Sequence, residues 1–161
     1  MKKQVLKYWV LLAVTVVSAA FIFLNSMNGY DTSHSASKAL LQFLLPSGHA
    51  AGETLTLLVR KAAHVIEYAA LGCVVMLLTL WIRDDFGKRG YGVACFAVLA
   101  IAVVDEHIQS FSDRTSSTGD ILLDFGGALI GFAVAGLIVY VHHCVKRKRE
   151  KTDGGAETTD R

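Results

Sequence analysis

Four apolar blocks constrain the fold of this chain more than any other feature. They cover residues 8–24, 62–82, 91–110 and 121–141. As a helix that rises about 1.5 Å per residue, each block is about long enough to cross a hydrocarbon core roughly 30 Å thick. Hydrocarbon offers no hydrogen-bond partner, so a crossing segment must satisfy its own backbone groups, and a helix does so. The blocks therefore predict an all-α fold, an integral membrane four-helix bundle.

The composition agrees with this interpretation, because 53% of the residues are hydrophobic and the mean hydropathy is +0.44. A soluble domain of 161 residues cannot bury that much apolar surface. The single proline, Pro46, lies outside all four blocks. The block 91–110 has one alternative, because Asp105, Glu106 and Gln109 lie near its end. That alternative is a buried helix of a soluble domain.

The first block also has an alternative, which is a cleaved secretory signal peptide. Three lysines precede the block, and Ser18-Ala19-Ala20 is similar to a cleavage site. The apolar run continues past this site to Leu24, which favours an uncleaved membrane anchor. Cleavage would leave three spans with the same orientation.

The three cysteines do not indicate a disulfide framework. Cys73 and Cys95 lie inside predicted spans, and Cys144 lies at the end of the last one. No pair of them has the spacing of a metal site. We interpret them as small, buried, apolar residues.

The basic residues predict the orientation in the membrane. Twelve of the 16 lie on one side: three before residue 8, three at residues 83–89 and six from residue 146 onward. The positive-inside rule places that side, and with it both termini, in the cytoplasm. Residues 1–145 then form the transmembrane domain. Residues 146–161 are charged and aperiodic, and we expect a basic, disordered cytoplasmic tail.

Two segments are then predicted to face outward, residues 25–59 and 111–119. Within the first, residues 36–45 carry apolar side chains at helical spacing and end at Pro46. This pattern predicts a short interfacial or re-entrant helix. The alternative is an ordinary loop with one apolar turn.

Polar residues gather where the spans meet the predicted outer side. The spacing of Arg60, His64 and Glu67 places them on one helix face, and Asp120 and Asp124 share a face in the same way. Counting residues from the span ends puts the polar groups of three helices at one depth. The candidate polar pocket comprises Arg60, Lys61, His64, Glu67, Tyr68, Asp105, Glu106, Gln109, Arg114, Asp120 and Asp124.

Acidic groups outnumber fixed positive charges in this set. Its five carboxylates face Arg60, Lys61 and Arg114, with His64 as a titratable fourth. Either some carboxyls are protonated, or a cation supplies the missing charge. We expect Arg114 to pair with one or two of the aspartates. We expect His64 to hydrogen-bond Glu67 or a carbonyl, with metal ligation as its alternative.

The cluster has two interpretations. Charges at bilayer depth are costly, so they face the bundle interior, find partners and commonly mark a functional site. The alternative is that the network only holds three helices together. Gly127 and Gly131 form a G-x-x-x-G pair on the stripe of Asp120 and Asp124, which predicts close helix packing there.

These motifs resemble the VanZ-like family of small bacterial membrane proteins. The resemblance covers about residues 60–132. It rests on Arg60-Lys61-x-x-His64-x-x-Glu67-Tyr68-x-x-Leu71-Gly72, on Asp105-Glu106-x-x-Gln109, and on Arg114 followed by Asp120-x-x-x-Asp124-x-x-Gly127-x-x-x-Gly131. It implies a multi-pass protein of the bacterial plasma membrane, with Gly72 among the helix-packing residues. The name-giving member is associated with teicoplanin resistance, and nothing in these residues argues for resistance directly.

We therefore expect a bacterial cell-envelope protein with an outward-facing polar pocket. Its ligand is left open between a membrane lipid, a lipid-linked cell-wall precursor and a glycopeptide antibiotic. The alternative is an intramembrane enzyme that uses acid–base or metal chemistry on a lipid-linked substrate. A transporter ranks third, because four helices enclose only a small pathway unless the chain oligomerises. No cofactor is expected, a divalent cation stays open, and nucleic acid is not an expected partner.

Overall fold

The fold is all-helical in the part of the chain that the structure describes. This computed structural model describes residues 2–27, 30–44, 53–81, 89–111 and 117–156. Its helices are α1 (Lys2–Met27), α2 (Tyr30–Leu44), α3 (Glu53–Trp81), α5 (Arg89–Ser110) and α6 (Thr118–Ala156). The all-α prediction is confirmed.

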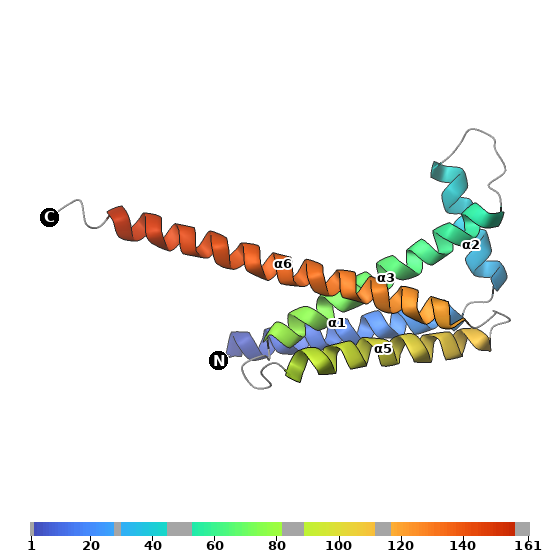
Figure 1. The fold of residues 1–161 in the computed structure, drawn as a ribbon, viewed down its shortest axis with the longest axis horizontal. Coiled ribbons are helices and arrows are strands. Elements are labelled where there is room, and N and C mark those ends of the chain that lie inside the picture. The colour runs from blue at the N-terminus through green and yellow to red at the C-terminus, as the bar shows by residue number, and fades with distance from the viewer. Residues whose placement is uncertain (1, 28–29, 45–52, 82–88, 112–116, 157–161) are drawn as a thin grey trace.

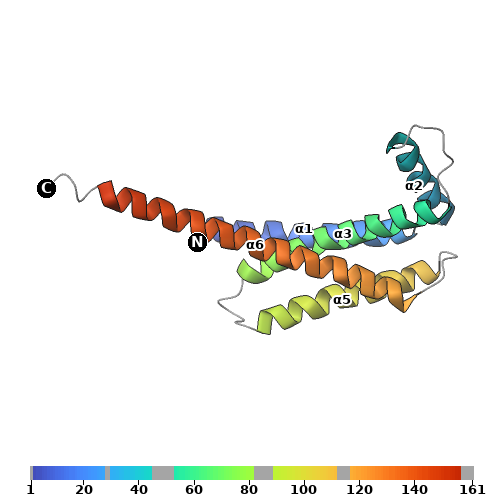
Figure 2. The ribbon, with the colours of Figure 1, turned by 45° about the horizontal axis from the view of Figure 1, so that its top comes forward.

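Helix α3 lies at the centre of the bundle (Figures 1 and 2). It packs against each of the other four helices, and its longest interface is with α6. Helix α5 closes the bundle by contacting both α1 and α6, while α2 packs against the first turns of α3. We call the end where α1 and α5 finish and α6 begins the polar end. The opposite end, where α1 begins and α3 finishes, is the basic end.

Four helices are long and apolar enough to cross a membrane, and they match the four predicted blocks. The candidate spans are Val5–Met27, Glu53–Trp81, Arg89–Ser110 and Thr118–Lys148. Large apolar side chains cover their outer faces, and Phe96, for example, is 73% exposed. A soluble monomer rarely exposes such extensive apolar surface, whereas lipid chains cover it without cost. The chain is therefore a multi-pass membrane protein.

The structure differs from the sequence expectation in the first connection. Helix α3 starts at Glu53 rather than residue 62, since residues 53–61 contain no proline or glycine that would stop a helix. The short helix expected over residues 36–45 is present as the longer α2, so the loop alternative is wrong. Residue 45 and Pro46 lie outside the described residues.

The last helix is also longer than expected. We predicted the fourth span over residues 121–141 and disorder from residue 146, but α6 continues unbroken to Ala156 and projects past the bundle (Figure 1). Lysine, arginine and glutamate are good helix formers, and nothing in 142–153 interrupts the helix. The helix ends just after Gly154 and Gly155, whose helix propensity is poor. Residues 157–161 lie outside the described residues.

Glycines allow α3 and α6 to approach with their backbones in contact. A side chain added to Gly131 would meet the carbonyl oxygen of Ala69, and one added to Gly72 would meet that of Ala128. At Gly127 the nearest atom would be the carbonyl oxygen of Val65, 2.6 Å from the new Cβ. This interface fixes α6 against the face of α3 that carries the polar residues.

Candidate functional site

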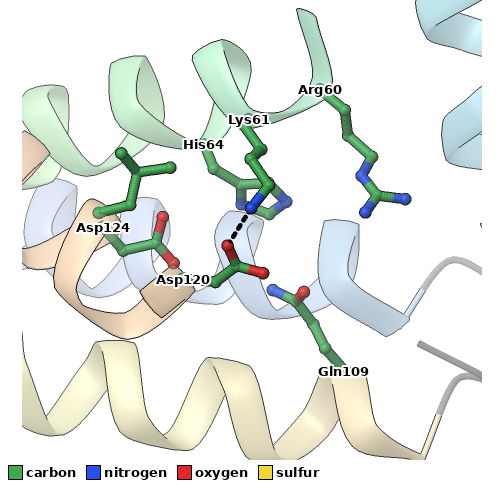
Figure 3. Close-up of a pocket in the computed structure, with 7 residues that line it drawn as sticks. Arg60, Lys61, His64, Gln109, Asp120 and Asp124 are labelled. Carbon is green, nitrogen blue, oxygen red and sulfur yellow. Dashed lines mark hydrogen bonds and ion pairs between the residues drawn. The ribbon is translucent and has the colours of Figure 1, made fainter. Parts of the chain in front are cut away.

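A small polar pocket lies at the polar end of the bundle. Figure 3 shows α3 contributing three side chains from one side, α6 contributing two aspartates, and α5 contributing Gln109 from below. The lining residues are Arg60, Lys61, His64, Gln109, Asp120, Leu123 and Asp124. The cavity volume is about 20 Å³, which is room for one water molecule or a single ion.

An ion pair joins α3 to α6 at the mouth of the pocket. Lys61 Nζ donates to Asp120 Oδ1 at 2.5 Å (Figure 3). Their side chains are 40% and 28% exposed, so water screens the pair. We had expected Arg114 to neutralise the aspartates, but Arg114 lies outside the described residues, and that pairing stays a prediction. Lys61 is the described partner of Asp120.

Removing the lysine from this pair should destabilise the fold only modestly. We expect Lys61→Met to cost about 1 kcal/mol, because a half-exposed pair gains little net energy. The double variant Lys61→Met/Asp120→Asn should recover part of that loss, since no aspartate is left without its partner. Thermal melting of the purified protein in mild detergent checks both. A double variant less stable than Lys61→Met would contradict the pairing.

A second polar contact joins α5 to α1. Gln109 Nε2 donates to Asp105 Oδ2 at 2.9 Å and to Ser26 Oγ at 3.4 Å. All three residues are buried, and Asp105 is completely so, at 0% exposed. Gln109 therefore holds Oδ2 of the carboxylate in place, and it makes no hydrogen bond to the other oxygen, Oδ1.

A third contact joins α1 to α3. Asn25 Nδ2 donates to Glu67 Oε1 at 2.8 Å. The other oxygen of Glu67, Oε2, lies 3.8 Å from His64 Nδ1, which is close but longer than a hydrogen bond. The glutamate thus lies between an amide that orients it and the imidazole that faces the pocket.

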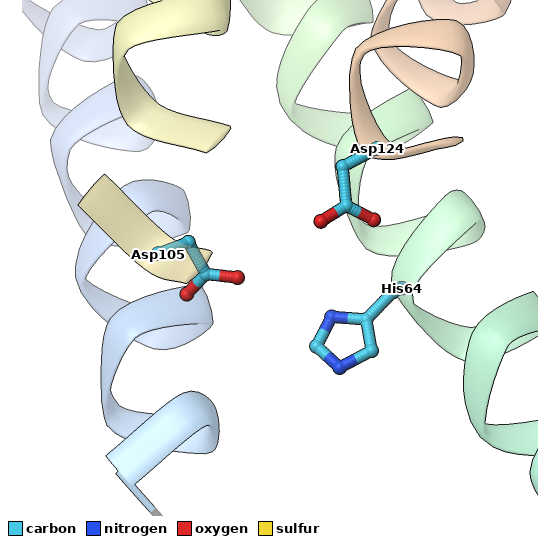
Figure 4. Close-up of side chains that lie close together, drawn as sticks. All are labelled: His64, Asp105 and Asp124. Atoms are coloured by element: carbon cyan, nitrogen blue, oxygen red, sulfur yellow. The ribbon is translucent and has the colours of Figure 1, made fainter. Parts of the chain in front are cut away.

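His64, Asp105 and Asp124 converge from α3, α5 and α6 (Figure 4). One ligand atom from each lies within 4.8 Å of the others. The hydroxyl of Tyr68, which is 0% exposed, lies within electrostatic reach of both aspartates. These groups come from positions far apart in the sequence, and they meet at the level that the depth estimate predicted.

Glu106 belongs to the connection between α5 and α6. Its Oε1 accepts a hydrogen bond from the backbone N–H of Ser117, just before α6 begins. Ser117 Oγ in turn accepts one from the backbone N–H of Gly119 at 3.2 Å, as an N-cap residue does. Glu106 is buried but does not line the pocket, so its described role is to hold the start of α6.

The residues that we expected in the pocket differ in where the structure places them. The expected residues that line the pocket are Arg60, Lys61, His64, Gln109, Asp120 and Asp124. Asp105, Glu67 and Tyr68 lie beside it, and Glu106 points to the connection before α6.

The sequence analysis missed two residues of α1. Asn25 and Ser26 contact the network, but we had assigned them to the outer segment 25–59. The available signal was their position directly after the apolar run that ends at Leu24, which puts them near the depth of Glu67 and Gln109. Sequence spacing relates residues within one helix and does not reveal which other helix they touch.

Comparison with models of known protein families gives a match. The model of the VanZ/LLP1 family matches residues 9–139. That range includes α1 from Trp9 onward and every described polar residue of the site, and so extends the resemblance well beyond residues 60–132. Searches of curated proteins and of solved structures each give no match.

Proposed function

This chain belongs to the VanZ/LLP1 family, and we propose that it is a cell-envelope protein whose polar pocket binds the anionic head group of a membrane lipid or lipid-linked cell-wall precursor. The observation that carries the proposal is the position of the pocket. It opens at the polar end of a membrane bundle, where Arg60 and Lys61 line it together. A lipid head group lies at that depth.

The size of the pocket supports a small ligand group. A cavity volume of about 20 Å³ accepts one or two atoms of a ligand, so the remainder must stay outside the bundle. A lipid phosphate meets this condition, because its acyl or prenyl chain can lie along the exposed apolar faces of the spans. Arginine and lysine are the usual partners of phosphate oxygens. A glycopeptide is far larger and could meet the pocket only at its mouth.

Binding to the purified protein in mild detergent tests the proposal. A fluorescent short-chain polyprenyl phosphate should bind at least about 10-fold more tightly than the matching polyprenol, because a hydrogen bond to a charged group contributes about 1.5–3 kcal/mol. Arg60→Gln should remove most of this difference. Equal binding of the phosphate and the alcohol would refute head-group recognition.

The matched control is Arg89→Gln. Arg89 is an exposed arginine in the first turn of α5, at the basic end of the bundle, so it tests whether lost positive charge alone weakens binding. We expect it to bind like the unchanged protein. Teicoplanin added as a competitor tests the glycopeptide alternative, and we expect no displacement.

A second candidate function is an intramembrane enzyme acting on a lipid-linked substrate. The convergence of His64, Asp105 and Asp124 favours it, since an imidazole and two carboxylates are suited to acid–base or metal chemistry. Release of inorganic phosphate from the polyprenyl phosphate would support this candidate.

The proposal places the polar end outside the cytoplasm of a bacterial plasma membrane, with both termini inside. The excess of lysine and arginine at the basic end supports this orientation, and Lys7 Nζ lies there 5.2 Å from the centre of the Trp81 ring. Cysteines introduced at Ser35 and Ser116 should react with an impermeant thiol reagent in whole cells. A cysteine at Gly154 should react only after permeabilisation, and the unchanged chain measures the background of its three cysteines. The reverse pattern would overturn the orientation.

A further inference from the structure

Three side chains from three helices bring the right donors for a metal ion to one point. Figure 4 shows the imidazole of His64 and the carboxylates of Asp105 and Asp124 directed toward a common space. Their ligand atoms lie within 4.8 Å of one another. Donor atoms bound at about 2.0–2.1 Å in a tetrahedral site lie roughly 3.3 Å apart, so the geometry is complete once side-chain rotations bring these atoms about 1 Å closer together.

A buried oxygen of Asp105 gives independent evidence that a ligand binds between these three side chains. Asp105 Oδ1 is fully buried and accepts no hydrogen bond from any residue that the structure describes. The Tyr68 hydroxyl is also buried without a hydrogen bond of normal geometry, and the Asp105 carboxyl is one of the groups with which it interacts. Buried polar atoms without partners are rare, because burying such an atom without a hydrogen bond is energetically unfavourable, and more so when it is charged.

The acidic groups around Asp124 also favour a bound cation. Asp124 is 3% exposed and lies within electrostatic reach of Asp105, Asp120, Glu106 and Glu67. Lys61, which lines the same pocket, is paired with Asp120. Two buried carboxylates this close to one another repel unless a proton or a cation lies between them.

We propose that His64, Asp105 and Asp124 bind a divalent transition-metal ion. An imidazole nitrogen together with carboxylate oxygens suits Zn²⁺ or Mn²⁺, whereas Mg²⁺ and Ca²⁺ prefer oxygen ligands alone. Three protein ligands leave at least one coordination position open toward the pocket. The pocket, which His64 and Asp124 line, gives the ion its route from the aqueous side.

The surrounding contacts orient the ligands as they do in known metal sites. Gln109 Nε2 holds Asp105 Oδ2 and leaves Oδ1 for the ion. Glu67, itself held by Asn25, lies beside the imidazole of His64 as the carboxylate does in carboxylate–histidine–metal arrangements.

The metal site goes beyond the head-group proposal and does not depend on it. A bound ion would offset the excess of carboxylates and give the pocket a positive centre next to Arg60 and Lys61, which is what a phosphate oxygen requires. Metal binding without any lipid tests the site alone, so failure of the head-group proposal leaves this result unaffected.

Metal titration of the full chain is the test. The protein is purified without a polyhistidine tag, stripped with a chelator, and titrated with Zn²⁺ or Mn²⁺ alone by calorimetry. His142→Gln/His143→Gln serves as the background, because these adjacent exposed histidines at the far end of α6 can bind Zn²⁺ nonspecifically. We expect one ion per chain and a raised melting temperature. No binding of either ion would overturn the proposal and leave Tyr68 as the proton donor to Asp105.

Matched variants locate the site. Asp124→Asn or His64→Gln should weaken binding at least about 100-fold, since loss of even an outer partner costs 10–100-fold. Glu53→Gln, an exposed acidic residue in the first turn of α3 at the same end of the bundle, should change it less than about 3-fold. An equal effect of Glu53→Gln and Asp124→Asn would indicate general attraction by acidic groups and refute the site. If either ligand variant fails to fold, Mn²⁺ bound to the unchanged protein should show electron-spin coupling to an imidazole nitrogen, and absence of that coupling refutes His64 ligation.

Discussion

Gly131→Leu should destabilise the bundle more than any other single change at the helix interfaces discussed above. The new Cβ would collide with the backbone carbonyl of Ala69 and approach the backbone nitrogen of Cys73. Backbone atoms cannot rotate away, so α6 must move off α3. Overpacking normally costs about 1–3 kcal/mol, and we expect at least the upper end of that range here. For a chain of this size, that corresponds to a melting temperature lower by roughly 6–12 °C.

Gly136→Leu is the matched control on the same helix. No atom of the described residues lies within 4 Å of the position that its Cβ would take, and the residue is exposed. Since leucine has a higher helix propensity than glycine, this variant should melt at the same temperature as the unchanged protein or slightly above it. Equal losses at 131 and 136 would mean that leucine disturbs α6 generally and that the close contact is not the cause.

The alanine substitution sharpens the test. In an ordinary helix Gly→Ala is stabilising by up to about 1 kcal/mol. At Gly131 even this single methyl group meets Ala69, so we expect the opposite sign. The substitutions Gly126→Ala and Gly127→Ala repeat the comparison at neighbouring positions. Of these two glycines, Gly127 faces the backbone of α3, so its substitution should be the destabilising one.

The sequence was sufficient to predict the four spans, because apolar length and the cost of unpaired backbone in lipid leave few alternatives. The sequence predicted the ends of the helices less accurately. The block limits follow hydropathy, whereas α3 and α6 continue as helices into polar sequence that contains no helix breaker. Nothing in an apolar profile distinguishes a helix that stops at the membrane surface from one that continues beyond it.

The site was predictable to the extent that residues share a helix face. The i, i+4 spacing placed Asp120 with Asp124, and depth placed both near His64. The partners across helices were not predictable from spacing: Lys61 pairs with Asp120, and Asn25 with Glu67. Such pairs depend on the rotation of each helix about its axis, and for α3 and α6 the close packing at Gly127 and Gly131 constrains that rotation.

Gln109→Leu should cause the largest loss at the polar end. Gln109 donates to the fully buried carboxylate of Asp105 and contacts Ser26 on α1. Leucine of similar size would leave Asp105 without its described donor, and a hydrogen bond to a charged group contributes about 1.5–3 kcal/mol. We expect a clearly lowered melting temperature in mild detergent. Ser110→Leu is the control, since the neighbouring Ser110 is exposed and its hydroxyl, within the described residues, bonds to the backbone of its own helix.

Adding Asp105→Leu to Gln109→Leu should restore part of this stability, because the isolated charge disappears and two apolar side chains replace the pair. No recovery would mean that Gln109 acts through Ser26 or through packing alone. The recovered double variant also distinguishes the two interpretations of the cluster. If the polar residues only hold the helices together, it should bind the polyprenyl phosphate as the unchanged protein does. If they form a site, it should be folded but should bind neither Zn²⁺ nor Mn²⁺, and its affinity for the phosphate should fall toward that for the alcohol.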